Sequence, residues 1–197
     1  MFRSVLLSLV LVGLCGCSIP SLHSIVSPEV VVDDPGLEGL WADDDGELVV
    51  RVGRADKGRF EVTVVSMPDN ARKTAAPISL DATLVKLGET TFADLVLNKE
   101  ERQQAAQKHH SMIVRTHQFI KVARIGDTLT IWSLDYEHVR DRLFDGTIPL
   151  AHARLDESEG GPDLVLTAPT DDLQAFLRSH AESPKVWTGP ATLKRRK

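Results

Sequence analysis

Cysteine is scarce in this chain. Its 197 residues hold two cysteines, and both lie in the stretch LVGLCGCS, Leu11 to Ser18. Two cysteines one residue apart, with no further cysteine in the chain, do not complete a four-ligand zinc site. An ordinary secretory signal in which Cys15 and Cys17 form a redox or metal pair is the alternative to the interpretation given below. With no other thiol to form disulfides, the fold depends on its hydrophobic core.

Long hydrophobic runs are also missing. The one apolar stretch, Val5 to Leu14, follows a single positive charge at Arg3. It does not continue beyond this point, because Gly16 and then Pro20 follow it. A spanning helix needs about 20 apolar residues. The stretch is therefore too short to anchor the chain and has the organisation of a signal-peptide core, which predicts a signal peptide over residues 1–16.

The end of this stretch, Leu14-Cys15-Gly16-Cys17, resembles the lipobox of bacterial lipoproteins. The resemblance selects Cys17, because cleavage before Cys15 would place the bulky Leu14 where the peptidase of that family accepts a small residue. It implies that Cys17 is acylated, becomes the mature N-terminus and ties the chain to the lipid bilayer. Acyl chains hold a protein to a membrane at about 0.8 kcal/mol per buried methylene. Ser18, which is not Asp, further implies the outer membrane of the bacterial envelope, facing the periplasm.

Signatures of catalysis and of nucleic-acid binding are absent as well. The sequence contains no G-x-S-x-G, H-E-x-x-H, G-x-x-x-x-G-K or G-x-G-x-x-G motif. We therefore expect no enzyme and no cofactor. The formal charge is −5, and removal of the signal leaves 22 basic and 28 acidic residues. Such a surface repels phosphate, so we expect no nucleic-acid partner.

The rest of the chain divides into a linker and one domain. Residues 17–36 hold three prolines and small polar residues without a helical period, which predicts a lipid anchor and linker, although Val30 to Val32 could lie along a sheet edge. Residues 37–197 are long enough for a single periplasmic domain with its own core. The closing residues, Leu193 to Lys197, are basic and are expected to form a solvated tail.

Alternating polar and apolar residues dominate the predicted domain, as is typical of antiparallel strands. The expected strands are 47–52, 59–64, 80–84, 91–97, 113–123, 128–134, 150–155 and 164–168, with a hairpin turn at Asp45-Gly46. The pattern predicts a mainly β fold: a meander of about eight strands that forms a strongly curved sheet or a small barrel.

Helices are expected to be few. Thr170 to His180 has an N-cap residue, two acidic residues in its first turn and one apolar face formed by Leu173, Phe176 and Leu177. We expect this C-terminal helix to cover one side of the sheet. Shorter connecting helices are predicted after Asn98 and over 135–143.

The stretch Gly39-Leu40-Trp41, followed by a β-meander and a late helix, resembles the lipocalin and calycin pattern, and Leu134-Asp135-Tyr136 resembles the second motif of that family. The resemblance implies that Trp41 closes one end of an eight-stranded barrel; alternatively, Trp41 is simply a core anchor. Leu37 to Trp41 and Thr167 to Leu173 are also similar to uncharacterised bacterial lipoproteins. The candidate ligand-binding residues are Trp41, Phe60, Phe92 and Trp132.

No metal site is predicted. His109 and His117 on one extended strand would be separated by roughly 26 Å, which is too far for one ion. Asp43-Asp44-Asp45-Gly46 resembles part of a calcium loop but has no Glu at the required distance, so a solvated hairpin turn is expected.

Three functions follow from these features. The first is a membrane-tethered envelope lipoprotein with a non-enzymatic binding, structural or assembly role, with an envelope protein as a further partner. The second is a lipocalin-like carrier of an apolar ligand, and the third is an envelope hydrolase without a recognisable motif.

Overall fold

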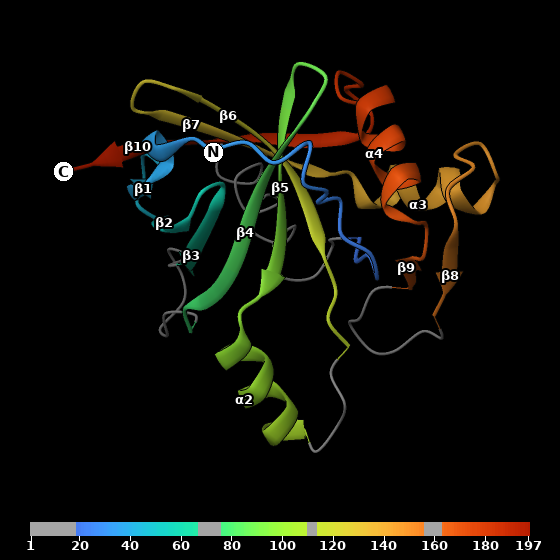
Figure 1. Ribbon diagram of the computed structural model, residues 1–197, viewed down its shortest axis with the longest axis horizontal. Coiled ribbons are helices and arrows are strands. Elements are labelled where there is room, and N and C mark those ends of the chain that lie inside the picture. The colour runs from blue at the N-terminus through green and yellow to red at the C-terminus, as the bar shows by residue number, and fades with distance from the viewer. Residues whose placement is uncertain (1–18, 67–75, 110–113, 156–162) are drawn as a thin grey trace, which may run out of the picture.

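A closed antiparallel barrel of eight strands forms the centre of the molecule (Figure 1). The computed structural model describes residues 19–66, 76–109, 114–155 and 163–197. Around the barrel the strands follow the order β1-β10-β7-β6-β5-β4-β3-β2. Their bounds are β1 Gly39–Ala42, β2 Leu48–Asp56, β3 Arg59–Ser66, β4 Ile78–Leu87, β5 Thr90–Leu97, β6 Gln118–Ile125, β7 Thr128–Leu134 and β10 Trp187–Arg196. The predicted mainly β meander is confirmed, and of its two predicted forms the structure has the small closed barrel. The strands expected over 150–155 and 164–168 are not part of this barrel and form a separate two-stranded sheet.

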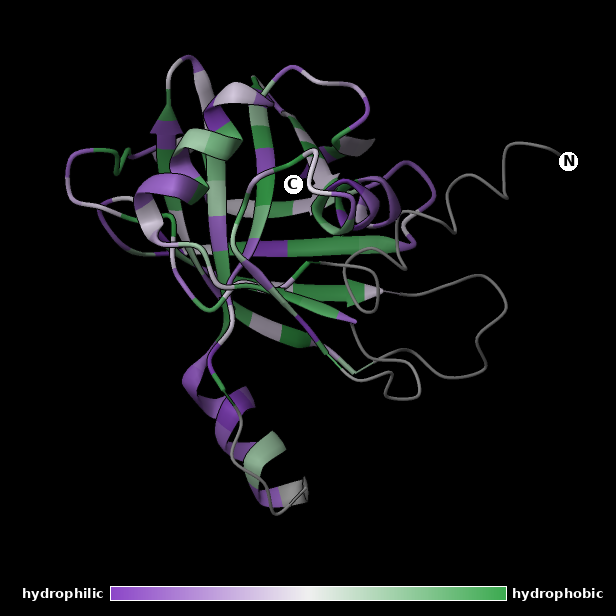
Figure 2. Ribbon diagram, turned by 90° about the vertical axis from the view of Figure 1, so that its right-hand side faces the viewer, coloured by the Kyte–Doolittle hydropathy of each residue, from purple (hydrophilic) through white to green (hydrophobic). Residues whose placement is uncertain are grey.

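The remaining elements are insertions in this meander. The 3-10 helix η1 (Pro35–Leu37) precedes β1, and α2 (Lys99–His109) connects β5 to β6. Between β7 and β10 the chain forms α3 (Tyr136–Phe144), the two-stranded sheet β8 (His152–Arg154) and β9 (Leu164–Leu166), and α4 (Thr170–Ser179). Figure 2 shows α2 as a largely hydrophilic helix that projects away from the barrel.

Tight turns join the early strands where the sequence predicts them. Gly46 lies in the β1–β2 turn and Gly88 in the β4–β5 turn, and both have positive φ, 74° and 66° respectively. A positive φ strains any residue with a Cβ, so glycine at these positions shortens the connection to a hairpin. In the first of these turns Asp43 accepts a hydrogen bond from the amide of Leu48 at 3.1 Å, as expected for a hairpin turn.

Alternate side chains of the strands fill the barrel interior. Because successive residues of a strand face opposite sides, one set points inward on every strand. The buried members of this inner core are Leu37, Trp41, Leu48, Val50, Val52, Phe60, Ala82, Leu84, Ala93, Leu95, Leu129 and Leu193. The interior is therefore a packed hydrophobic core.

A second core lies on the outside of the barrel. Leu173, Phe176 and Leu177 of α4 are buried in a cluster with Val85, Leu87 and Phe92, which point outward from β4 and β5. Val139 and Leu143 of α3 belong to the same cluster. The helix predicted over 170–180 thus covers the sheet as expected, although it is followed by β10.

The N-terminal segment 19–36 differs from the predicted linker, because it is packed along the barrel. Ile19 and Ile25 are buried members of the outer core, and Val31 pairs with Val85 on β4. The sequence allows Val30 to Val32 to lie along a sheet edge, but it does not predict the burial of Ile19 and Ile25. A proline-rich composition indicates that a segment is not helical, but it does not show whether the extended segment packs against the rest of the domain.

Strand β10 was not predicted, and it corrects the expectation of a solvated basic tail. Lys194, Arg195 and Arg196 lie in this strand and pair with Ala42, Trp41 and Leu40 of β1. A bulge between Thr188 and Ala191, at Gly189-Pro190, interrupts the alternation by which strands are recognised. Without β10 the sheet would stay open between β1 and β7.

The start of α4 also differs in detail. The sequence predicts Thr170 as the N-cap acceptor, but Pro169 is the N-cap residue and caps with no side-chain hydrogen bond. The hydroxyl of Thr170 instead donates to the carbonyl of Ser24 at 2.8 Å, which ties the helix to the N-terminal segment.

Candidate functional site

A pocket of about 570 Å³ opens at one end of the barrel, between the β4–β5 and β6–β7 hairpins. Strands β5 and β6 pair from Leu95 and Gln118 to Thr91 and Val122, and beyond this point the two hairpins extend separately. A gap forms where the ladder ends, and the segment Val32 to Leu37 lines one side of it. The volume is within the usual range for small-molecule sites, roughly 300–1,000 Å³.

The floor of the pocket is apolar. Leu37, Leu84 and Leu129 line it and also belong to the inner core of the barrel. Val32 and Val122, which pack against that core, line it as well. A ligand in the pocket would therefore lie on the packed end of the barrel interior, and it would not enter the barrel.

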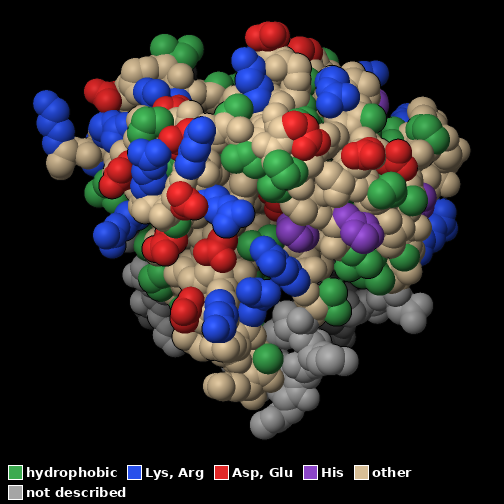
Figure 3. Space-filling model, in the orientation of Figure 1, with side chains coloured by type: hydrophobic (Ala, Val, Ile, Leu, Met, Phe, Trp, Pro, Cys, Tyr) green, Lys and Arg blue, Asp and Glu red, His purple; other side chains and the backbone are tan. Residues whose placement is uncertain are grey.

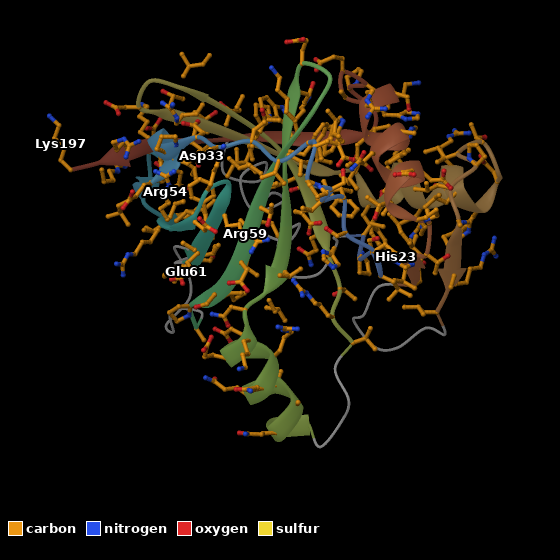
Figure 4. All side chains as sticks on the ribbon, viewed as in Figure 1. His23, Asp33, Arg54, Arg59, Glu61 and Lys197 are labelled. Carbon is orange, nitrogen blue, oxygen red and sulfur yellow. The ribbon has the colours of Figure 1, made fainter. Side chains whose placement is uncertain are left out.

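Most charged groups on the rim are paired with one another. Both guanidinium nitrogens Nε and Nη2 of Arg124 donate to the Asp34 carboxylate, at 2.9 and 2.8 Å. The hydrogen bonds from Arg124 hold the pKa of Asp34 below its usual value. Asp33 forms an ion pair with Arg54 at 2.5 Å, and both residues are labelled in Figure 4. These carboxylates hold the N-terminal segment to the barrel and leave little charge for a ligand.

Lys121 differs from the other charged groups of the pocket. Its ammonium lies 4.8 Å from the ring centroid of Trp132 and 5.6 Å from that of Trp187, and donates one hydrogen bond of 2.8 Å, to the carbonyl of Ala181. No carboxylate lies within 4 Å of it among the described residues. An ammonium has three donors, so Lys121 can donate further hydrogen bonds to an anionic group in the pocket.

The four candidate aromatic residues do not share a site. Trp41 and Phe60 are buried inside the barrel, whereas Phe92 is buried in the outer core, with its ring 5.6 Å from that of Trp187. Trp132 alone lines the pocket. The sequence separates inward from outward residues by their alternation, but it does not show which of them reach an open end of the barrel.

Trp41 is anchored within the inner core. Its indole nitrogen donates to the carbonyl of Leu37 at 2.8 Å, and the guanidinium carbon of Arg195 lies 4.3 Å from the ring centroid. The side chain is completely buried, and through Leu37 and Arg195 it contacts both η1 and β10. This environment fits a core anchor at the barrel end.

A second polar cluster lies on the outer face of β5, around Asp94, whose exposed fraction is 4%. Its carboxylate accepts hydrogen bonds from the hydroxyl of Ser24 at 2.5 Å and from the amide of Ile25 at 2.9 Å. Its other oxygen lies 2.7 Å from Nδ1 of His117. In a nucleophilic triad the serine hydroxyl contacts the histidine, whereas here it donates to the aspartate. The cluster therefore holds the N-terminal segment in place. Sequence analysis missed it, because Asp94 occupies an ordinary position of an alternating strand.

No group of three potential metal ligands occurs among the described residues. His117 precedes β6 and faces Asp94, while His110 lies outside the described residues. Asp44, in the hairpin turn after β1, pairs with Lys194 at 2.9 Å. Cys17 and the predicted signal peptide also lie outside the described residues.

Comparison with known proteins places this chain in no family. No family model, curated protein or solved structure matches it. In the part of the chain that the structure describes, no helix has both the length and the hydrophobicity needed to cross a membrane.

Proposed function

We propose that this protein is a lipid-anchored lipoprotein of the bacterial envelope whose barrel binds a small amphipathic ligand without chemical conversion. The pocket at the barrel end carries the proposal. It combines an apolar floor with one ammonium, that of Lys121, which has unused hydrogen-bond donors. A compact apolar group would cover Leu84 and Leu129, and an anionic substituent would meet Lys121. The anchor at Cys17 would keep this pocket at the periplasmic surface of the outer membrane.

The alternative function, a lipocalin-like carrier of a long apolar ligand, has less support. Such a carrier needs an empty barrel, whereas Trp41, Phe60 and Leu193 are almost completely buried in this one. The hydrolase has less support as well, because Ser24 and His117 bind separate oxygens of Asp94. The lipocalin-like Gly39-Leu40-Trp41 motif is compatible with a binding role but does not indicate which ligand is bound.

The pocket predicts saturable binding of 1-anilinonaphthalene-8-sulfonate, a compact apolar anion, at about one site per chain. Lys121→Met should weaken this binding about tenfold, since a hydrogen bond to a charged group contributes roughly 1.5 kcal/mol or more. Fluorescence titration of the folded protein measures both affinities.

Lys99→Met is the matched control, because Lys99 begins α2, at the opposite end of β5 from the pocket. It should leave the affinity unchanged. Equal binding to the wild type and the Lys121→Met variant would contradict the proposed site. If a long-chain fluorescent fatty acid bound at one site per chain and displaced 1-anilinonaphthalene-8-sulfonate, the result would favour the carrier function instead.

The anchor has a test of its own. We expect Cys17→Ser to abolish metabolic labelling with radioactive palmitate and to leave an unprocessed precursor, since the acylated thiol is lost. Cys15→Ser should retain the label. Labelling that persists in the Cys17→Ser variant would show that the lipobox interpretation is wrong.

A further inference from the structure

The described chain begins at a rigid junction. Ser21 pairs through its backbone with His117, with the two amide-to-carbonyl hydrogen bonds at 2.9 and 2.8 Å. On its other side the same segment pairs with β9: the amide of Leu166 donates to Pro20 and the amide of Leu22 donates to Leu166, at 2.8 and 2.9 Å. Ile19 and Ser21 are buried. The segment is thus held between two neighbours from its first described residue.

This junction limits the distance between the domain and a lipid anchor. Cys17 stands two residues before Ile19, and two extended residues span at most about 7 Å. A linker of 20 residues would let the domain move freely above the membrane, but a segment fixed at Ile19 does not. An acyl chain on Cys17 therefore brings the surface around the junction to the lipid headgroups.

Exposed hydrophobic side chains surround the same junction. The large hydrophobic residues classed as exposed among the described residues are Leu22, Leu40, Leu97, Val114, Ile125 and Leu155. Leu22 follows Ser21 directly, and Val114 precedes His117 by three residues. The amide of Leu155 donates to the carbonyl of Asp163, three residues before Leu166. Three residues of extended chain cover about 10 Å, so each of the three lies close to the backbone that holds Ser21.

The surface view agrees with this placement. In Figure 3 hydrophobic side chains border the grey residues at the lower right, with histidines beside them. Figure 4 labels His23, the neighbour of Leu22, on this side of the molecule, beside β9 and away from Arg54 and Asp33. Exposed apolar side chains that gather at one place on a surface mark a contact with a membrane or a partner.

We propose that the junction face, defined by Leu22, Val114 and Leu155, lies against the lipid headgroups on the periplasmic surface of the membrane that holds Cys17 and inserts these side chains among them. The inference rests on the proposed acylation of Cys17. It fixes the orientation of the pocket as well. Arg124, on the pocket rim, follows His117 by seven residues, about 23 Å of extended chain, so the rim lies at the end of β6 that is distant from the bilayer.

The test uses the full-length acylated protein in phosphatidylcholine vesicles. Leu22→Cys, Val114→Cys and Leu155→Cys are each labelled with a nitrobenzoxadiazole maleimide, which is site-specific because Cys15 leaves with the signal and the thiol of Cys17 is acylated. Replacing the lipid with phosphatidylcholine brominated on its acyl chains should reduce the fluorescence of all three labels at least twofold.

Leu40→Cys and Ile125→Cys are matched controls. Both residues are exposed and hydrophobic, but Leu40 lies on β1 and Ile125 ends β6 at the pocket end of the barrel. Their labels should lose less than a tenth of their fluorescence. Similar quenching at the controls and at the junction face would overturn the proposed orientation.

The mass of the mature N-terminal peptide separates the two possible failures. An acylated Cys17 together with unquenched labels on the junction face overturns the orientation alone. A peptide without acyl chains overturns the anchor, and the orientation with it.

Discussion

Trp41→Ala is expected to lower the free energy of unfolding by about 3 to 5 kcal/mol, the range found when a buried aromatic side chain is removed from a core. The indole ring is completely buried, and its neighbours come from η1, β2 and β10. The substitution removes the hydrogen bond to Leu37 and the surface on which Arg195 lies. Urea unfolding, followed by far-ultraviolet circular dichroism, measures the loss.

Leu40→Ala is the control for this effect. Leu40 is the preceding residue of β1 and points to the outside of the barrel, where its exposed fraction is 41%. We expect that substitution to change stability by about 0.5 kcal/mol or less, as is usual for a surface position. If the two variants were equally stable, Trp41 would not be a core anchor.

Asp94→Ala is expected to lower the free energy of unfolding by about 3 kcal/mol, because it leaves one buried and two half-buried polar groups without a partner. The amide of Ile25 and the hydroxyl of Ser24 lose their acceptor together, and both belong to the segment held against β5. The loss should be local as well as global. Hydrogen exchange of the amides of residues 19–25 should become faster than that of the barrel strands.

Two further variants delimit this result. Asp94→Asn keeps one acceptor oxygen and should lose less stability than Asp94→Ala. Asp81→Ala, at an exposed position of the neighbouring strand β4, should change stability by about 0.5 kcal/mol or less. Unchanged exchange at residues 19–25 in the Asp94→Ala variant would show that the N-terminal segment is held by other contacts.

The barrel strands were predictable to the extent that their patterns are local. Polar and apolar residues alternate without interruption from Arg59 to Val64, and the turn residue Gly88 marks the end of β4. Strands and hairpins of this kind can therefore be predicted from short stretches of sequence. The bulge at Gly189-Pro190 removes the same local signal from β10. Without a signal for β10, the sequence is equally compatible with an open, strongly curved sheet and with a closed barrel.

The candidate site was less predictable, because it depends on contacts between distant residues. The residue type of Trp132 makes it a candidate for ligand binding. Its partner Lys121 lies on another strand, and Ala181, which accepts a hydrogen bond from Lys121, follows α4. Ser24 and Asp94 are 70 residues apart in the sequence. Local alternation carries no information about such pairs; they are fixed by how the hairpins end and by where the N-terminal segment docks.

The seam between β1 and β10 has a consequence for the order of folding. It joins Trp41 to Arg195, about 150 residues apart, while most other strand pairs join neighbours along the chain. The hairpins from β2 to β7 can therefore assemble early, while β1 keeps an unpaired edge until β10 is present. Until β10 has been synthesised the nascent sheet presents this open edge to other chains, and a chaperone that shields exposed strand edges would act in that interval.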